Sequence, residues 1–283
     1  MKGKPCYAPS KTRVNSKDVS IGGKKNTNGD SESDLFDKAE YIKMFWVGLM
    51  DGGGSIQVNH WREKSLQYRL IIKLSYLDSN YNMLIEIAKV IGGTVRITNK
   101  GKDVIWVVDD KNKVKEIVKI YDTYPPLTSR KKCQLAFLKA CLIDRSKDKS
   151  LTVKSYLINR SLKYNEQELN IKKSNLFFSQ GGTPSYFKGW LSGFIEAEGC
   201  FSIRKSDILS FSIGQNDDLY LLEAIKSYFE VTNKVRNPYG AFYSLEIYKK
   251  TVLSKIIAHC TSYPLMGEKS VSLKKFKEKL SQI

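Results

Sequence analysis

Histidine and cysteine are scarce in this chain of 283 residues. The two histidines are His60 and His259, and the five cysteines are scattered without a CxxC pair. A structural zinc site and a disulfide framework both need such residues at short, regular spacings, so neither is expected. This pattern of cysteine usage favours a reducing compartment.

Long hydrophobic runs are also lacking. A helix that crosses a membrane needs about 20 consecutive apolar residues, and no segment of the sequence approaches that length. The first residues lack the apolar stretch of a secretory signal. Residues 1–34 are instead rich in Ser, Lys, Asn and Gly without hydrophobic periodicity, which predicts a flexible basic tail.

Acidic residues are few compared with basic ones. The chain has 29 Asp and Glu against 47 Lys and Arg, which gives a net charge of +18. Such an excess predicts a polyanionic partner. Nucleic acid is the favoured partner and an anionic membrane surface is the alternative; the absence of an apolar span argues against a membrane partner.

An internal duplication is the most informative feature that the sequence does contain. The segment WVGLMDGGGSI at 46–56 is repeated as LSGFIEAEGCF at 191–201, so that Gly48 and Gly193 correspond at an offset of 145 residues. Further along the chain, Val95-Arg96 recurs as Val235-Arg236 and Tyr124-Pro125 recurs as Tyr263-Pro264, at offsets of 140 and 139 residues. A steady offset with one deletion indicates two copies of one domain.

Each copy has the hydrophobic pattern of a helix, two strands, a helix, two strands and further helices. The pattern predicts an α+β fold with two pseudo-symmetric αββαββα domains at 35–151 and 184–283, joined by a linker at 152–183 that is partly helical around 165–171. The expected elements of the first copy are 36–52, 55–61, 66–76, 79–91, a hairpin at 94–108, 111–122 and 130–143. Those of the second copy are 185–198, 200–205, 208–215, 217–229, a hairpin at 232–248, 250–261 and 268–280.

Small residues form a stripe on the first helix of each copy. Gly48 and Gly52 lie four residues apart, as do Gly193 and Ala197. Two helices with such stripes can approach closely, so we expect the copies to pack along them as a pseudo-twofold pair. Two separate domains, each with an ordinary buried helix, are the alternative. The glycine that ends each helix, Gly54 or Gly199, is suited to a left-handed C-cap.

The acid before that last glycine is present in only one copy, where Glu198 corresponds to Gly53. A pair of carboxylates at this place would bind divalent metal for phosphodiester cleavage, and here the pair is incomplete. Asp51 and Glu196 lie two residues earlier, about 200° around the helix. For these two acids a capping or backbone-bonding role is favoured over a catalytic one.

Alternation in the strands predicts a polar outer surface. Ile56 and Val58 match Phe201 and Ile203 as inward-facing residues, which leaves polar and basic side chains facing outward. A twisted antiparallel ribbon of this kind fits the major groove of DNA; a solvated sheet face is the alternative. The DNA-binding candidates on the strands and hairpins are Gln57, Asn59, Trp61, Arg69, Lys73, Arg96, Thr98, Ser202, Arg204, Ser206, Ser210, Ser212, Lys234 and Arg236.

Five segments together resemble the LAGLIDADG homing endonucleases in their single-chain, two-repeat form, over roughly residues 38–283. They are VGLMDGGGSI, LSGFIEAEGCFSI, SIGQNDD, YPPLTSRK and YPLMGEK. The resemblance implies a saddle of antiparallel β-sheets over a long double-stranded DNA site, Mg²⁺-dependent cleavage of both strands, and a monomer with internal pseudo-twofold symmetry. It also implies an origin in a group I intron of a mitochondrion or another organelle. Some members of the family are maturases that help such introns splice.

Carried over by position, the resemblance makes Glu198 a catalytic and metal-binding acid, Gln215 a residue that orders water, and Lys269 a stabiliser of charge near the phosphate. The first copy has Gly53, Tyr76 and Arg130 at these places, with Lys131 next to Arg130. Because Gly53 removes one metal ligand, we expect cleavage of both strands to be impaired, with nicking of one strand as the residual activity.

Two other functions compete with this one. The chain could serve as a maturase that binds intron RNA by its shape and phosphates, through lysines such as Lys154, Lys163, Lys172 and Lys173. A catalytically inert repressor is the third hypothesis.

Overall fold

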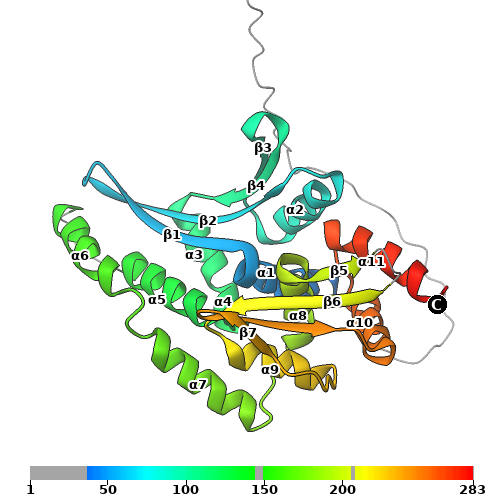
Figure 1. The fold of residues 1–283 in the computed structure, drawn as a ribbon. Helices are drawn as coiled ribbons and strands as arrows, with labels where there is room; N and C mark the ends of the chain where they lie inside the picture. The colour runs from blue at the N-terminus through cyan, green and yellow to red at the C-terminus, as the bar shows by residue number, and fades with distance from the viewer. Residues whose placement is uncertain (1–36, 144–148, 205–207, 283) are drawn as a thin grey trace, which may run out of the picture. The chain divides into compact units, whose positions relative to one another are not determined.

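The computed structural model describes residues 37–143, 149–204 and 208–282. The tail expected at 1–34 and the DNA-binding candidate Ser206 lie outside these residues. Two halves of the same construction follow one another along the described chain (Figure 1).

The first half contains α1 (Lys38–Gly53), β1 (Gly54–Trp61), β2 (Ser65–Ser75), α2 (Asp78–Ile91), β3 (Thr94–Thr98), the short 3-10 turn η1 (Asn99–Gly101), β4 (Asp103–Val108), α3 (Lys111–Val118), α4 (Ile120–Thr123) and α5 (Ser129–Ile143). Two helices follow, α6 (Lys149–Leu162) and α7 (Gln167–Ser179). The second half contains α8 (Phe187–Glu198), β5 (Cys200–Ile203), β6 (Leu209–Asn216), α9 (Leu219–Tyr228), β7 (Arg236–Tyr239), β8 (Phe242–Ile247), α10 (Lys250–Ser262) and α11 (Glu268–Leu280). The predicted order of elements is confirmed.

Each half contains a four-stranded antiparallel sheet. The strand orders are β1-β2-β4-β3 and β5-β6-β8-β7, so the two sheets have the same topology. The register is also equivalent, because Ser55 pairs with Ile71 as Cys200 pairs with Ser212. The α+β class with two related halves is therefore confirmed.

The strands are covered by helices on one face only. In β1, Ile56 and Val58 are buried while Asn59 and Trp61 are exposed, as expected for a strand with one face in the core. Both core and helices lie on the inward side: the buried rings of Trp46 on α1 and Trp106 on β4 meet edge to face at 5.8 Å. In the described part of the chain, the opposite side of β1 is exposed at Asn59 and Trp61.

The linker is more helical than the sequence pattern predicts. Residues 152–183 were expected to be helical only around 165–171, whereas α6 and α7 occupy most of the segment. Both helices are packed: the Tyr156 hydroxyl donates to the Val58 carbonyl at 2.9 Å, and the Lys132 ammonium of α5 donates to the Ser174 hydroxyl at 2.6 Å. Tertiary contacts therefore stabilise helices whose polar composition suggested a loop.

Two local expectations were wrong. The helix predicted at 111–122 is divided at Lys119, whose amide donates to the Glu116 carbonyl three residues back and tightens the turn. Gly54 and Gly199 are not left-handed caps, since their φ angles are −83° and −73° in extended conformations. Glycine is needed there for close approach: a Cβ at Gly199 would lie 2.7 Å from the Ile195 carbonyl oxygen.

Candidate nucleic-acid interface and cleavage centre

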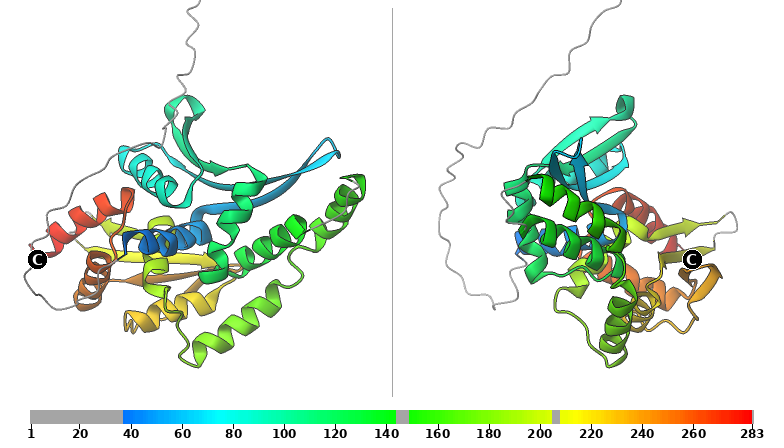
Figure 2. Two further views of the ribbon diagram at one scale, coloured as in Figure 1. Left: turned by 180° about the vertical axis from the view of Figure 1, so that it is seen from behind. Right: turned by 90° about the vertical axis from the view of Figure 1, so that its left-hand side faces the viewer.

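Helices α1 and α8 lie side by side where the two halves meet (Figures 1 and 2). The contact is symmetric at its glycines. A Cβ added to Gly48 would lie 1.9 Å from the Trp190 carbonyl oxygen, and one added to Gly193 would lie 1.8 Å from the Phe45 carbonyl oxygen. Backbone therefore packs on backbone, and the expected close pairing of the two motif helices is confirmed.

At the C-terminal end of this helix pair, only one of the two last residues is a carboxylate. Glu198 is the last residue of α8, and Gly53 is the last residue of α1. Gly52 packs against the Ala197 methyl and the Glu198 side chain, because a Cβ there would lie 2.4 Å from the former and 3.0 Å from the latter. A Cβ on Gly53 would meet only the Ala197 methyl, at 3.7 Å. Position 53 thus has room for a side chain that it lacks.

Two lysines act on Glu198 from the two halves. Burial raises the pKa of the Glu198 carboxyl, and the positive charges of Lys131 and Lys269 oppose that rise. Burial also lowers the pKa of Lys131, while nearby negative groups including Asp51 act in the opposite direction. The remaining acid therefore lies in a partly buried setting with cations of both α5 and α11 nearby.

Arg130, the positional counterpart of Lys269, is directed to the linker. Its guanidinium lies 5.0 Å from the centre of the Tyr164 ring, and the ammonium of Lys163 lies 4.6 Å from the same ring. Between the two adjacent residues, the one whose charge acts on Glu198 is Lys131. One step along helix α5 turns a side chain by about 100°, which separates the two cations.

Gln215 lies on β6 opposite Tyr243. Burial raises the pKa of the Asp218 carboxyl, and Ser129 and Gln215 are among the neighbouring groups that oppose the rise. The shared register of the two sheets makes Leu74 the counterpart of Gln215, since Ile71 corresponds to Ser212. The prediction that Tyr76 corresponds to Gln215 was therefore wrong. The strands β2 and β6 correspond at a different offset from the one that the sequence pairing used. The first half has an apolar residue at this place.

Asp51 and Glu196 are buried acids that hold the loops before α5 and α11. Asp51 accepts hydrogen bonds from the Leu127 amide at 2.7 Å, the Thr128 hydroxyl at 2.7 Å and the Trp190 indole at 2.7 Å. Glu196 accepts from three amides, those of Met266, Gly267 and Lys269, at 3.2, 3.0 and 2.9 Å. The expected backbone-bonding role of these acids agrees with these contacts.

Sequence reasoning missed two residues that brace one half against the other. The Ser129 amide at the start of α5 donates to both oxygens of Asp218, at 3.2 and 3.1 Å. In the reciprocal contact, the Glu268 amide at the start of α11 donates to Asn80 Oδ1 at 2.9 Å. For Asp218, the signal in the sequence was the polar run SIGQNDD, which does not indicate the helix whose first amides this residue binds.

The donor set at the helix ends does not fit a pair of dications held by protein carboxylates. Within the described residues, no three His, Cys, Asp or Glu side chains are grouped so as to hold a metal ion. Mg²⁺ is usually held by one or two carboxylates together with substrate phosphates and water. Glu198 supplies one carboxylate and Gly53 none, so the two-acid site that the family pattern implies is incomplete in this chain.

The outward surface of the first sheet gathers the polar candidates of that half on one face, here called the first outer face. Gln57 pairs with Arg69 and Asn59 with Gln67, so these side chains share a face. Lys73 and Arg96 both pair with Ile105 from opposite sides and lie on the same face. The members predicted from the sequence are Gln57, Asn59, Trp61, Arg69, Lys73, Arg96 and Thr98, and all have the parity of this face.

The second outer face is the matching side of the other sheet, with Ser202, Arg204, Ser212 and Arg236. Ser202 pairs with Ser210, Ser212 with Glu246, and Arg236 with Ser244. Ser210 corrects the prediction, because its side chain is only 2% exposed and is not available to a partner. Lys234 is exposed but precedes β7 rather than lying in it.

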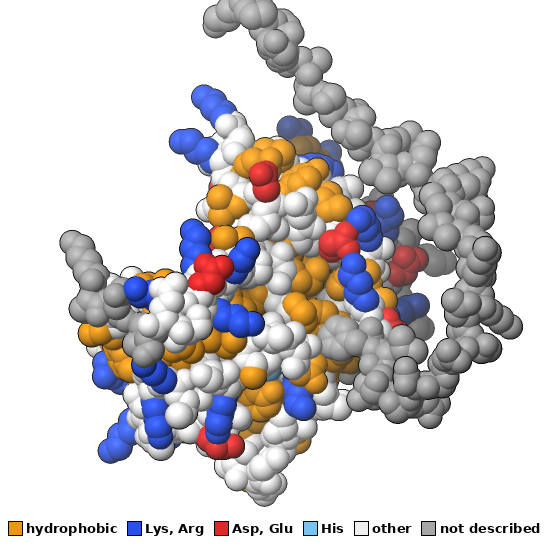
Figure 3. Space-filling model, turned by 90° about the vertical axis from the view of Figure 1, so that its right-hand side faces the viewer, with side chains coloured by type: hydrophobic (Ala, Val, Ile, Leu, Met, Phe, Trp, Pro, Cys, Tyr) orange, Lys and Arg blue, Asp and Glu red, His pale blue; other side chains and the backbone are white. Residues whose placement is uncertain are grey.

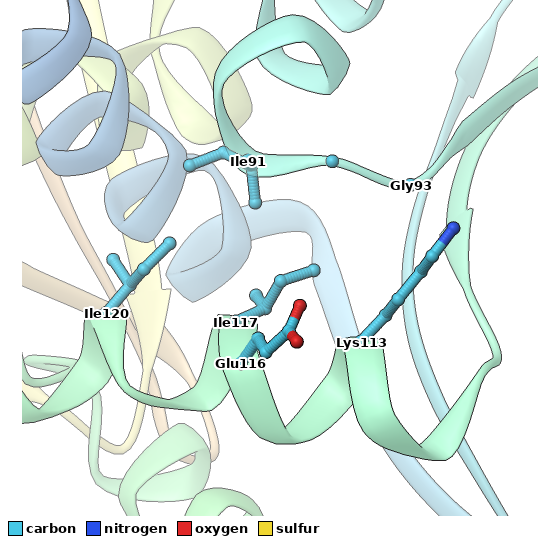
Figure 4. Close-up of a pocket in the computed structure, with 7 residues that line it drawn as sticks. Ile91, Gly93, Lys113, Glu116, Ile117 and Ile120 are labelled. Atoms are coloured by element: carbon cyan, nitrogen blue, oxygen red, sulfur yellow. The ribbon is translucent and has the colours of Figure 1, made fainter.

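The described part of the chain has basic side chains on the side shown in Figure 3 and a cavity away from the α1–α8 contact. On the side shown in Figure 3, Lys and Arg side chains are spread among uncharged ones. A cavity of about 240 Å³ lies between the end of α2 and α3, lined by Ile91, Gly93, Lys113, Glu116 and Ile117 among others (Figure 4). It shares no residue with the α1–α8 contact.

Over the described part of the chain, no helix is both long and apolar enough to cross a membrane.

A family model described as "LAGLIDADG endonuclease" matches residues 46–141 and 191–280, which are the two repeats. The probable intron-encoded endonuclease aI3 of Debaryomyces hansenii is 54% identical over 264 residues, covering 86% of this chain and 38% of that protein. This chain therefore spans well under half the length of that relative. The probable intron-encoded endonuclease aI3 of Dictyostelium citrinum is 44% identical, covering 84% of this chain and 95% of its own length.

Solved structures agree with the fold. The LAGLIDADG homing endonuclease I-GzeII in complex with its DNA target has a TM-score of 0.66 at 20% identity, over 85% of this chain and 90% of that one. I-SmaMI, bound to an uncleaved DNA target in the presence of calcium ions, has a TM-score of 0.60 at 18% identity, over 83% and 89%. With the duplicated motif, the paired helices and the match of both repeats, this chain belongs to the LAGLIDADG endonuclease family.

Proposed function

We propose that this chain binds a specific double-stranded DNA site as an intron-encoded homing endonuclease whose cleavage of both strands is impaired. The observation that carries the proposal is the end of the α1–α8 pair, where Glu198 has no acidic partner because position 53 is glycine. The names of the relatives and the DNA-bound solved structures support the proposal that the chain binds DNA. We further propose a monomer, since one chain supplies both halves, and an organelle as its compartment.

Binding of DNA and cleavage of DNA need different groups at the C-terminal end of the α1–α8 pair. Lys131 and Lys269 place positive charge beside Glu198, where it can attract a phosphodiester group, although Lys269 also pairs with Glu268 at 3.5 Å. Hydrolysis of both strands needs acids that hold metal and organise water at each scissile phosphate. The chain's own residues can therefore hold the DNA backbone at the centre, while the acid pair for cleavage is incomplete. Mg²⁺ is the ion that we propose for the completed pair.

The test restores the missing acid. Supercoiled plasmid that carries the insertion site of the chain's own intron is incubated with Mg²⁺ and the wild-type chain, Gly53→Asp or Gly53→Glu. We expect the wild-type chain to leave the plasmid intact or nicked, and the better of the two acid variants to linearise it about 10³-fold faster, because a lost metal ligand costs several kcal/mol of transition-state stabilisation. Gel electrophoresis over time measures the rates.

Gly52→Asp is the matched control. It adds the same acid one residue earlier, where a Cβ would lie 2.4 Å from the Ala197 methyl, so it should destabilise the helix pair without restoring cleavage. Glu198→Gln in the Gly53→Asp background should abolish the restored linearisation. If neither acid at position 53 gives linear product from a plasmid that the protein binds, the assignment of this position as the missing acid is wrong.

A second function, assistance to intron splicing, is favoured by the basic linker helices. Lys154, Lys172 and Lys173 are exposed on α6 and α7. The Tyr156 hydroxyl of α6 donates to the Val58 carbonyl, and its ring lies 5.9 Å from the ring of His60. The His60 side chain has the inward parity of Ile56 and Val58, so α6 packs on the core side of β1 rather than on the first outer face. Faster splicing of the intron RNA with wild-type protein, together with no cleavage by any variant, would select the maturase function instead.

A further inference from the structure

The second outer face carries an acidic residue in its middle. Glu246 lies on β8 opposite Ser212 of β6 and is about one-quarter exposed. An unpaired carboxylate on a surface that meets DNA would be repelled by the phosphates. Glu246 is not unpaired: one oxygen lies 2.8 Å from Arg204 Nη2 and the other 3.6 Å from Arg236 Nη1. The three side chains form a cluster with a net positive charge.

Glu246 thus holds two arginines by its two oxygens. Arg204 is fixed a second time, since Nη2 also donates to the Tyr248 hydroxyl at 3.0 Å and its guanidinium lies 5.4 Å from the centre of the Tyr248 ring. These contacts use Nη2 of Arg204 and Nη1 of Arg236, so Nε and the other Nη group of each guanidinium are left as donors. The side chains of Arg204 and Arg236 remain 53% and 68% exposed, so donors are left for a partner.

Among the described residues of the first outer face, no carboxylate joins two arginines in this way. By the shared register, the counterpart of Glu246 is Val107, which pairs with Ile71 as Glu246 pairs with Ser212. The ion pair on this face is Lys73 with Asp103, at 2.9 Å. A lysine is a flexible point charge, whereas a guanidinium is planar and presents two parallel donors. Arg69 and Arg96 also lie on the first outer face, so the two faces differ in the carboxylate that joins two arginines rather than in the presence of arginine.

We propose that Arg204 and Arg236 each bind the major-groove edge of a guanine, and that Glu246 is a positioning residue that fixes both. Guanine presents O6 and N7 as two acceptors, which match the two donors of a guanidinium, and this is the commonest specific contact to a base. Two arginines held by one carboxylate lose less freedom on binding than two free arginines. The inference rests on the proposed DNA-binding function and adds which bases the second half recognises.

The test identifies the guanines by their atoms. Duplexes bound by the wild-type chain are selected from a random library, and each guanine of the selected site is then replaced by 7-deazaguanine, which lacks N7. We expect guanines in the half that contacts β5–β8 to weaken binding about ten-fold or more when replaced. Arg204→Ala should remove the effect at one of them and Arg236→Ala at another, as measured by Kd in fluorescence anisotropy.

Glu246→Gln tests the positioning role. It keeps the size of the side chain but removes the charge, so preference for guanine over adenine at both places should fall about ten-fold while affinity for unrelated duplex is kept or increased. Glu223→Gln is the matched control, because Glu223 pairs with Lys226 on α9, away from the outer face. All variants should melt like the wild-type chain.

The outcomes separate the two proposals. If no duplex is enriched from the library, sequence-specific DNA binding fails and the guanine contacts fail with it. An enriched site whose guanines tolerate 7-deazaguanine, or whose guanine preference survives Glu246→Gln, leaves the DNA-binding function standing and overturns only the roles of the two arginines and Glu246.

Discussion

The acidic residues of the duplicated motif differ in what surrounds them, and the surroundings set their roles. Glu196 accepts three backbone amides, and Asp51 accepts two amides, a hydroxyl and an indole, so both are occupied inside the protein. Glu198 instead has the charges of two lysines nearby and belongs to the last turn of α8. Of these three acids, Glu198 is the one with no hydrogen bond from a backbone amide among the described residues, which leaves it as the candidate ligand of a metal ion.

The buried carboxyl of Asp218 predicts how the stability of the fold depends on pH. It is fully buried, and burial raises its pKa from the ordinary 3.8 to about 6, although hydrogen bonds from Ser129 oppose the rise. Because the pKa is higher in the folded than in the unfolded chain, the folded chain binds the proton more tightly. The resulting stabilisation is complete below about pH 4 and is lost as the pH rises through about 6.

We therefore expect Asp218→Asn to gain stability relative to the wild-type chain as the pH rises from about 4 to about 8, by on the order of 2 kcal/mol. Urea unfolding of both proteins at the two pH values measures the difference. A difference in unfolding free energy that is the same at both values would contradict the buried titration of Asp218.

At the scale of elements, the α1–α8 pair determines how the halves meet. The two glycines let carbonyl groups of one helix lie where a Cβ of the other would be. Reciprocal bonds then brace the halves further: the Tyr41 hydroxyl donates to the Pro264 carbonyl and the Tyr186 hydroxyl to the Pro125 carbonyl, both at 2.6 Å. The helix pair and these braces form one continuous interface.

Gly193→Ala should lower the free energy of unfolding by about 3 kcal/mol or more, because its Cβ would lie 1.8 Å from a backbone oxygen that cannot rotate away. Gly53→Ala is the control on the partner helix. Its Cβ would have an ordinary contact of 3.7 Å, and alanine favours a helix over glycine by up to about 1 kcal/mol. Thermal and urea unfolding check both; equal destabilisation by the two variants would argue against the close helix contact.

At the scale of the whole molecule, the net charge of +18 is the dominant property. If the outer faces neutralise about 6–10 phosphates, affinity for duplex DNA should fall about 10³- to 10⁵-fold between about 50 and 200 mM salt. Measurement of Kd against salt for a selected and a random duplex tests this. A Kd that hardly changes with salt would be incompatible with binding through the phosphate backbone.

Much of this could be predicted from the sequence because it depends on local patterns. Alternation of apolar and polar residues gave the strands and their outer faces, since a side chain in a strand must point to one face or the other. The small residues at Gly48 and Gly193 predicted the helix pair, and the difference between Gly53 and Glu198 at matching places of the repeat is a matter of residue type alone. The duplication repeated each of these signals, which made them easier to recognise.

The tertiary structure decided what depends on residues far apart in the chain. The burial of Ser210, the contact of Arg130 with the Tyr164 ring and the influence of Lys131 on Glu198 all follow from how α5, the linker and the sheets pack. The same is true of Asp218 capping a helix of the other half and of Glu246 joining two arginines from separate strands. A sequence pattern fixes which face a residue takes on its own element; only packing fixes which side chains of other elements it meets.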